Sequence, residues 1–243
     1  MNQRTGLFAN GLIWFGAAVS VAEIEAGIQS QNNWTALIAG HLLGGAMLFA
    51  VGLIGARIRK NAMETTATAF GKRGSKFFAS LNLLQLVGWT AVMIAQGTAA
   101  LGGLEESLRS PFTSAGLALA IAVWLFVGIK RAASIATVGM ALLSILFALL
   151  TFKIFGGALT GGVLVTDGSL AVGSGAVAAN AASRLSFWGA FEISVAMPLS
   201  WLPLISDYTK NAERPFAGTL VSALVYTLVS MWMYGIGIVI GNS

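Results

Sequence analysis

Long apolar segments limit what this chain can fold into. Several of them reach the roughly 20 residues that an α-helix needs to cross a bilayer. The 243-residue chain is 56% hydrophobic and only 9% charged, whereas about a quarter of the residues of a soluble domain are charged. These values predict an all-α protein that crosses a membrane several times. The sequence has no cysteine, which excludes disulfides and thiolate-bound metals.

Seven apolar segments are predicted to be membrane helices. They cover residues 6–28, 34–56, 76–101, 112–129, 132–155, 185–205 and 216–240. The stretch 57–75 is predicted to be a loop on the basic side. The stretch 156–184, rich in Gly, Ala, Ser and Val, is predicted to be a long loop on the opposite side.

Basic residues are divided unevenly between the two predicted sides. Of the 14 Lys and Arg residues, three fall opposite the N-terminus (Arg109, Lys153 and Arg184), and the other eleven fall on its side. Cytoplasmic loops collect Lys and Arg, so we predict a multi-pass protein of the cytoplasmic (inner) membrane with its N-terminus inside. The net charge of +5 therefore reflects membrane topology and does not indicate nucleic-acid binding.

Two of the apolar segments are interrupted in similar ways. Trp14–Gly27 (WFGAAVSVAEIEAG) contains glycines, a serine and two glutamates, and Trp188–Trp201 (WGAFEISVAMPLSW) partly repeats it with another glutamate and a proline. Interrupted segments at corresponding positions of two halves are typical of transporters, whose binding site lies between them near the membrane midplane.

The order of the helices suggests how the two halves are related. The first five predicted helices (6–155) cross the membrane an odd number of times, so a second copy starting at residue 185 would begin on the opposite side. This arrangement predicts an inverted-topology repeat. The second copy (185–243) would hold two of its five helices.

Several linked motifs resemble a known family. AFGKRGSKF (69–77) and GWTAVM (88–93) resemble the third helix of the nucleobase:cation symporter-1 family, and ISDYTKNAERP (205–215) resembles its signature after the sixth helix. Within that family, SVAEI, METTATAFG, NLLQLVGWTAVM and MPLSWLPLISDYT look most like the hydroxymethylpyrimidine-transporter (CytX-like) branch. The similarity covers nearly the whole chain.

The resemblance implies a LeuT-like fold and a secondary transporter that works by alternating access. We expect it to import a pyrimidine, with hydroxymethylpyrimidine for thiamin synthesis as the first choice, together with Na⁺ or H⁺. A cytosine, purine or allantoin permease is the alternative. Family members have ten core helices, so a chain ending after the seventh could instead be transport-incompetent without the others. Neither an enzymatic activity nor a cofactor is expected.

The resemblance also assigns roles at the first interruption and on the third helix. The backbone carbonyls of Gly16 and Val19 fall where the family binds sodium, and Ser20 falls where a polar side chain faces the substrate. A packing seam of small residues would explain the same pattern. Trp89 is expected to stack on a flat heterocycle, because an indole offers a large, rigid π-face.

Two neighbours of Trp89 could adjust this site. Met93 stands where hydantoin-transporting members carry glutamine, which argues against hydantoins. Gln85, one turn in the other direction, either compensates for that missing amide or forms a hydrogen bond between helices. Trp201 is the candidate for the second wall of a π-sandwich around the ring.

Glutamates inside membrane helices are costly and are usually functional. Glu23 and Glu192 are therefore predicted to bind the substrate, whose amidine edge suits a carboxyl group, or to take part in coupling. Glu25 is assigned to an outer edge. His41 is expected to be a packed or hydrogen-bonded residue rather than a proton relay, and Asp207 to fix the cytoplasmic end of the sixth helix.

Overall fold

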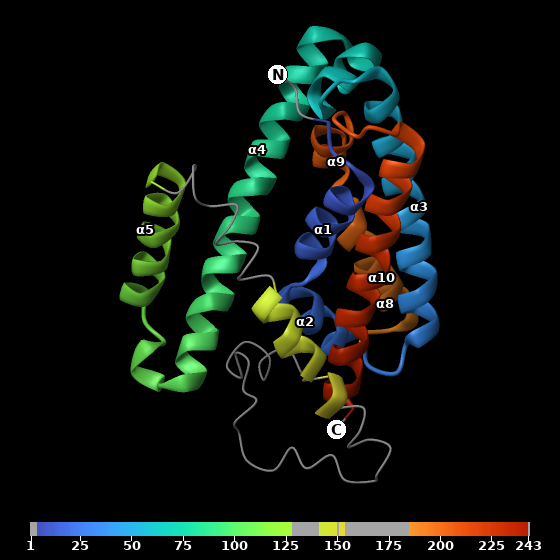
Figure 1. The fold of residues 1–243 in the computed structure, drawn as a ribbon. Coiled ribbons are helices and arrows are strands. Elements are labelled where there is room, and N and C mark those ends of the chain that lie inside the picture. The colour runs from blue at the N-terminus through green and yellow to red at the C-terminus, as the bar shows by residue number, and fades with distance from the viewer. Residues whose placement is uncertain (1–3, 128–140, 150, 154–184, 243) are drawn as a thin grey trace.

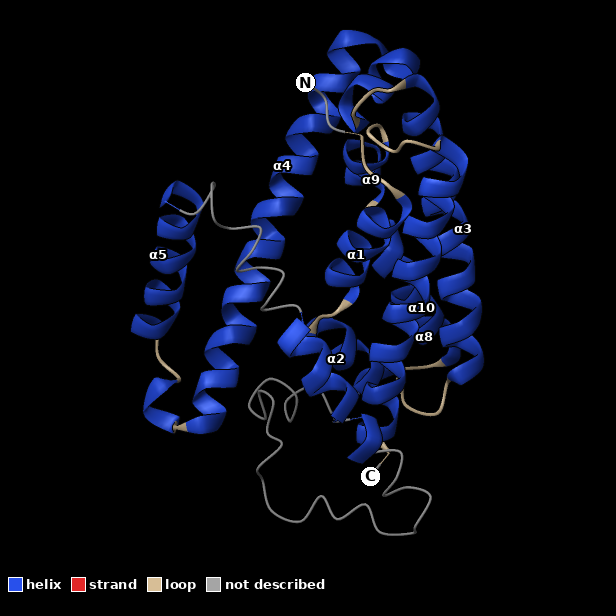
Figure 2. Cartoon of the chain, viewed as in Figure 1, coloured by secondary structure: helices blue, strands red, loops and turns tan. Residues whose placement is uncertain are grey.

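The computed structural model describes residues 4–127, 141–149, 151–153 and 185–242. Within these ranges the chain is helical and is connected by short turns, as Figures 1 and 2 show. This confirms the predicted all-α class. The predicted loop 156–184 lies outside the described residues. The helices are α1 (Leu7–Ala18), α2 (Val21–Ser30), α3 (Trp34–Ile58), α4 (Ala62–Leu104), the 3₁₀ turn η1 (Glu106–Leu108), α5 (Pro111–Val127), α8 (Phe187–Leu199), α9 (Leu202–Thr209) and α10 (Pro215–Gly241).

Six of the seven predicted membrane segments correspond to apolar helices, and of the span predicted at 132–155 the described residues, 141–149 and 151–153, are helical. Four are long and apolar enough to cross a membrane: α3, α4, the α8–α9 stretch (Phe187–Thr209) and α10. The bent pair α1–α2 would make a fifth span, and two shorter apolar helices lie at Pro111–Phe126 and Ala141–Lys153. The chain is thus a multi-pass membrane protein by the length and composition of its helices.

The third predicted helix was wrong at its start, because residues 62–75 are helical and do not form a loop. Asn61 caps this helix: its side chain accepts a hydrogen bond from the Glu64 backbone N–H at 2.8 Å, and the Glu64 carboxylate accepts one from the Asn61 N–H at 3.0 Å. Such a reciprocal capping box fixes a helix start. A kink follows at Gly71, whose φ of 67° favours glycine.

In the core, each interrupted helix packs against a straight helix from the other part of the chain. The straight helix α3 follows the interrupted α1–α2 in sequence, and the straight helix α10 follows the interrupted α8–α9. The straight helix α10 packs against α1 and α2, and α3 packs against α8 and α9. Helix α4 lies at one edge of this core, where it contacts α9, and α5 lies beyond α4 (Figure 1).

Glycines allow two of these helix pairs to approach closely. A Cβ atom at Gly27 on α2 would collide with the backbone of Tyr234, and one at Gly237 on α10 would collide with the carbonyl oxygen of Ile24. A Cβ at Gly40 on α3 would lie 2.6 Å from the Cβ of Ser194 on α8. Small residues at such seams are the usual way in which membrane helices pack closely.

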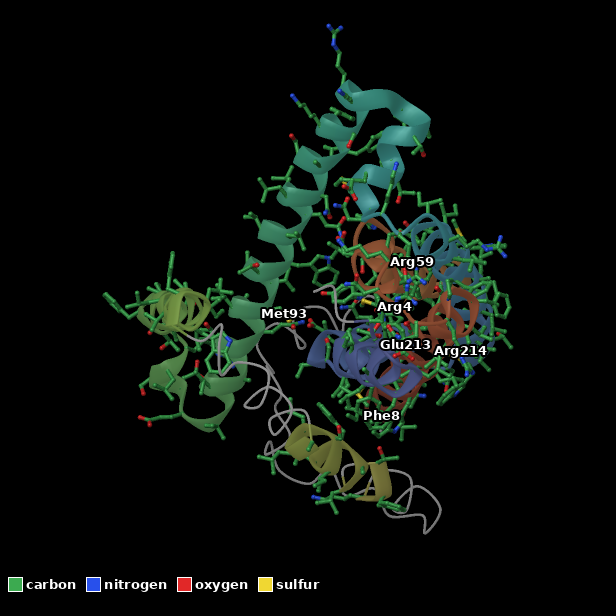
Figure 3. All side chains as sticks on the ribbon, turned by 45° about the horizontal axis from the view of Figure 1, so that its top comes forward. Arg4, Phe8, Arg59, Met93, Glu213 and Arg214 are labelled. Atoms are coloured by element: carbon green, nitrogen blue, oxygen red, sulfur yellow. The ribbon has the colours of Figure 1, made fainter. Side chains whose placement is uncertain are left out.

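Charged side chains gather at one end of the core. The N-terminus and the start of α4 lie at one end (Figure 1). In Figure 3, Arg4, Arg59, Glu213 and Arg214 lie together at that same end of the core. That this end is cytoplasmic remains a prediction from the positive-inside rule.

Candidate functional site

The first interruption is a bend of 57° between α1 and α2. Val19 ends α1, with its N–H donating to the Phe15 carbonyl at 3.1 Å. Ser20 caps α2, with its hydroxyl oxygen accepting from the Ala22 N–H at 3.1 Å. The last carbonyls of one helix and the first N–H groups of the next have no partners within their own helices. Gly16, Val19 and Ser20 therefore lie at or next to a bend that suits small polar ligands or ions.

The second interruption is gentler. Ser200 and Trp201 separate α8 from α9 but keep right-handed backbone angles, and Phe187–Thr209 counts as a single span. Pro198 lies in the last turn of α8 and Pro203 in the first turn of α9. A proline removes one N–H donor and clashes with the preceding turn, so carbonyls near this point need partners from elsewhere.

One such partner comes from α4. The Gln85 Nε2 donates to the Ser200 carbonyl at 2.6 Å. This contact favours the second alternative for Gln85, a hydrogen bond between helices. Three turns later on α4, the Gln96 Nε2 donates to the Glu25 carboxylate on α2 at 2.8 Å. These two amides connect α4 to both interrupted helices.

Trp89 and Met93 lie on α4 between these two amides. Residues four apart share a helix face, so Trp89 follows Gln85 on the side that approaches the core, and Figure 3 shows Met93 between α4 and the core helices. Trp89 is partly exposed, and Met93 is 42% exposed. Both side chains thus retain free surface.

Trp201 belongs to an aromatic cluster at the centre of the core. Its ring centroid lies 5.4 Å from that of Trp14 and 6.1 Å from that of Tyr226, both in edge-to-face arrangements. The Trp14 indole is buried, and its Nε1 has no hydrogen-bond partner among the residues that the structure describes. The structure therefore places Trp201 beside both the first interrupted helix and α10.

Glu23 is buried in the core with only 2% of its surface exposed. The Tyr226 hydroxyl donates to its Oε1 at 3.1 Å, and the Ser230 hydroxyl donates to its Oε2. Both donors come from α10. A buried carboxyl group is tolerated when hydrogen bonds of this kind compensate for its lost hydration.

Glu192 has a different environment, although it stands in the repeated segment. Its side chain is exposed on α8, and no hydrogen bond joins it to Glu23 in the described part of the chain. The buried polar residue of α8 is Ser194, whose hydroxyl donates to the Leu37 carbonyl at 2.8 Å. The structure thus does not bring the two predicted glutamates together.

The structure confirms the expectation that His41 is a packed, hydrogen-bonded residue. This fully buried residue lies with its Nε2 at 2.7 Å from the Ser230 Oγ and its Nδ1 at 2.6 Å from the Ser194 Oγ. A chain of hydrogen bonds therefore runs from Glu23 through Ser230 and His41 to Ser194. Its four members come from four different helices, so no local sequence signal could have revealed it.

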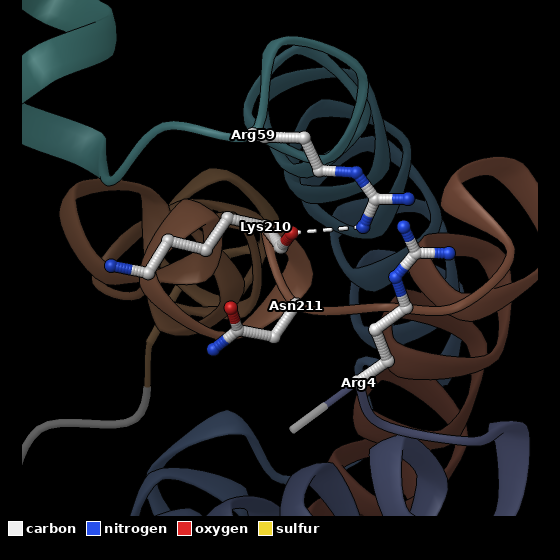
Figure 4. A pocket seen from close by; sticks show the side chains of 4 residues that line it. All are labelled: Arg4, Arg59, Lys210 and Asn211. Carbon is white, nitrogen blue, oxygen red and sulfur yellow. Dashed lines mark hydrogen bonds between the residues drawn. The ribbon is translucent and has the colours of Figure 1, made fainter. Parts of the chain in front are cut away.

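A second polar region lies at the basic end of the core. Arg4, Arg59, Lys210 and Asn211 line a cavity of about 440 Å³ (Figure 4). The Arg59 guanidinium donates to the Lys210 carbonyl at 2.9 Å and to that of Ala212. This lining is cationic and has no aromatic ring, so it does not suit a flat, neutral heterocycle.

Comparison with known proteins gives one match. The model of the family described as permease for cytosine/purines, uracil, thiamine, allantoin matches residues 3–242. No curated protein and no solved structure matches the chain.

Proposed function

The chain belongs to the family of permeases for cytosine/purines, uracil, thiamine and allantoin, and within it we propose a secondary active transporter that imports a pyrimidine. The family is one of transporters, not of enzymes. We propose hydroxymethylpyrimidine as the substrate, because the branch motifs quoted above resemble that branch, and Na⁺ or H⁺ as the coupling cation. Cytosine, uracil, purines and allantoin are the competing substrates.

The pairing of the interrupted helices carries this proposal. The interrupted α1–α2 lies on α10, and the interrupted α8–α9 lies on α3. Two repeats of opposite topology, related by a pseudo-twofold axis, would produce such a reciprocal pairing, and transporters of this design bind their substrates where interrupted helices meet. This supports a LeuT-like inverted repeat with a first copy over residues 6–155 and a second copy beginning at residue 185.

The proposed substrate site lies between α4 and the two interruptions. The hydrogen bond from Gln85 to Ser200 holds α4 beside the second interruption, and Trp89, one turn further on, offers its indole face to a planar ring. Met93 lines the same face, Ser20 contributes from the first interruption, and Trp201 from the second.

The two glutamates take different parts in this proposal. Both carboxylate oxygens of Glu23 already accept hydrogen bonds from α10, so its geometry favours a coupling role over direct contact with the substrate. Glu192 is exposed and remains the proposed partner for the amidine edge of an aminopyrimidine.

A cation site is proposed at the carboxyl end of α1. The carbonyl groups of Gly16 and Val19 lie there, and the end of a helix carries a partial negative charge that favours a cation. Of the two proposed coupling cations, this is the site that sodium would occupy.

Uptake by the purified chain in proteoliposomes tests the proposed function. Radiolabelled hydroxymethylpyrimidine is supplied under an inward Na⁺ gradient, an inward pH gradient, or no gradient, with unlabelled cytosine, uracil and allantoin as competitors. We expect saturable uptake that one gradient accelerates and that allantoin inhibits least. Absence of saturable uptake of any of these compounds under either gradient would overturn the proposal.

Substitution of Trp89 tests the proposed site in the same assay. Trp89→Ala removes the stacking face, which is worth about 1–3 kcal/mol per base, so KM should rise about tenfold or more, and Trp89→Phe should restore part of the affinity. Trp124→Ala on α5, where the indole is 42% exposed, is the matched control. Equal KM values for the two alanine variants would contradict the stacking role.

A further inference from the structure

We propose that Glu23, Ser230, His41 and Ser194 form a single proton-binding chain and that the proton is the coupling ion of this transporter. The inference rests on the transport function proposed above, and it gives the buried chain a role beyond holding the helices together.

The members of the chain are placed so that each one contacts the next. Ser230 donates to Glu23 and lies 2.7 Å from the His41 Nε2, while Ser194 lies 2.6 Å from the His41 Nδ1 and 2.8 Å from the Leu37 carbonyl. All four are buried, with 2% of the surface of Glu23 exposed and none of the surface of the other three. No water is needed to connect them.

When Glu23 is ionised, the hydrogens of the chain have one arrangement, and it leaves the Leu37 carbonyl without a donor, although the His41 Nδ1 lies 3.1 Å and the Ser194 Oγ 2.8 Å from that oxygen. A serine hydroxyl has one hydrogen to donate, and a neutral imidazole has one donor and one acceptor nitrogen. Ser230 donates to Glu23, so it must accept from the His41 Nε2–H. The acceptor is then the His41 Nδ1, which receives the hydrogen of Ser194.

One added proton reverses the direction of every bond in the chain. A proton from water enters at the Ser194 end, and the Ser194 O–H bond breaks as an Nδ1–H bond forms on His41. The Nε2–H proton of His41 then passes to Ser230, whose own proton passes to Glu23. Glu23 becomes a neutral acid that donates to Ser230, Ser230 donates to the His41 Nε2, and Ser194 regains a proton and donates to the Leu37 carbonyl.

The surroundings of Glu23 suit a group that binds and releases a proton. The titratable groups facing the chain are Tyr226 and Tyr234 from α10; the Tyr234 ring lies edge-on to His41 at 4.7 Å, and its hydroxyl donates to the Ile193 carbonyl. Glu25 on α2 is bonded to Gln96 of α4, and Glu192 of α8 is exposed. In the described ranges no Lys or Arg forms an ion pair with Glu23, so a proton is the means of neutralising its charge.

The chain also connects the elements that must move in alternating access. Glu23 belongs to the interrupted α1–α2, Ser194 to the interrupted α8–α9, and Ser230 and His41 to the straight helices α10 and α3. Separation of α2 from α10, or of α8 from α3, breaks the chain. The proton therefore binds with different affinities to the arrangement in which the chain is intact and to the one in which it is broken. A coupling ion requires such a difference.

Nuclear magnetic resonance of the imidazole tests this inference without any substrate. His41 is the only histidine in the sequence, so ¹⁵N-labelled histidine gives signals from this ring alone. We expect the ring of the wild-type protein in lipid nanodiscs to change from the Nε2–H tautomer at alkaline pH to the Nδ1–H tautomer at acidic pH. Glu23→Gln should abolish this change, and Glu25→Gln should retain it.

A second variant covers the case in which Glu23→Gln fails to fold. Ser230→Ala removes the hydroxyl that connects Glu23 to His41, and it should also abolish the tautomer change. A ring that keeps one tautomer at every pH in the wild-type protein, or that changes equally in Glu23→Gln, would overturn the proton chain.

Uptake measurements distinguish this failure from failure of the proposed function. Saturable uptake in a protein whose His41 shows no tautomer change would overturn the proton chain and leave the transporter standing. A tautomer change that depends on Glu23, in a protein without saturable uptake, would overturn the transporter function on which coupling rests.

Discussion

The two interrupted helices have similar sequences but hold their polar residues in different ways. In the first, Glu23 of the segment SVAEI is buried against α10 and accepts two hydrogen bonds. In the second, Glu192 of the segment FEISVA is exposed, and Ser194 is the buried polar residue. A repeated sequence therefore does not imply equal environments.

Under the proposed function, this difference gives the two interrupted helices different parts. The first interrupted helix bends by 57° and contributes a titratable group to the core. The second stays closer to straight and contributes a serine to the same chain, while its Ser200 carbonyl binds the side chain of Gln85.

The largest expected contrast is between the two glutamates. Glu23→Ala removes two buried hydrogen bonds, those that the carboxylate accepts from the Tyr226 and Ser230 hydroxyls, and a hydrogen bond to a charged group is worth about 1.5–3 kcal/mol. We expect a loss of about 3 kcal/mol in the free energy of unfolding, seen as a lower Tm in detergent. Glu192→Ala should stay within about 0.5 kcal/mol, as exposed substitutions do. Equal losses in the two variants would show that the burial of Glu23 is not what separates the two helices.

Close packing of the two interrupted helices gives the next contrast. An alanine at Gly27 would collide with the backbone of Tyr234, and one at Gly40 would lie 2.6 Å from the Cβ of Ser194 and 2.9 Å from the Phe191 carbonyl oxygen. Overpacking usually costs about 1–3 kcal/mol, and Gly27→Ala should be the worse because the three atoms nearest to its Cβ all belong to the backbone of Tyr234.

The control for this contrast is Gly116→Ala on α5, where a Cβ meets nothing within 4 Å. It should stabilise the helix by up to about 1 kcal/mol. Thermal unfolding of the three variants is the measurement, and a Gly27→Ala protein as stable as Gly116→Ala would refute the close approach of α2 to α10.

The smallest expected effect concerns the attachment of α4 to the second interrupted helix, α8–α9. Gln85→Leu removes the donor to the Ser200 carbonyl, and hydrogen bonds between membrane helices are worth about 1 kcal/mol. Stability should fall by about that amount, and uptake should fall with it because Trp89 is no longer held beside the interruption. Thr90→Leu, on an exposed part of α4, is the control. A normal uptake rate in Gln85→Leu would remove this bond from the proposed site.

The fold could be predicted from sequence wherever hydrophobicity alone decides. Helices α3 and α10 begin and end, and α5 begins, within a few residues of the predicted spans, because long apolar runs bounded by polar residues leave few alternatives in a membrane. The start of α4 was missed because residues 62–75 are polar, and their helix depends on the Asn61–Glu64 capping box and not on hydrophobicity.

The candidate site was predictable only in part, because its contacts join distant segments. Composition marked Glu23 and Glu192 alike as costly membrane carboxylates, but only the packing of α10 decides that Glu23 is the buried one. His41 meets Ser194 and Ser230, which lie 153 and 189 residues away along the chain. Nothing in the local sequence of α3 indicates these partners.

The most direct test of the central role of Glu23 is uptake driven by a pH gradient. We expect proteoliposomes containing the wild-type protein or Glu25→Gln to take up hydroxymethylpyrimidine faster under an inward proton gradient. Glu23→Gln should lose this acceleration while still exchanging substrate across the membrane. A Glu23→Gln protein that responds to the gradient as strongly as the wild-type protein would contradict the account.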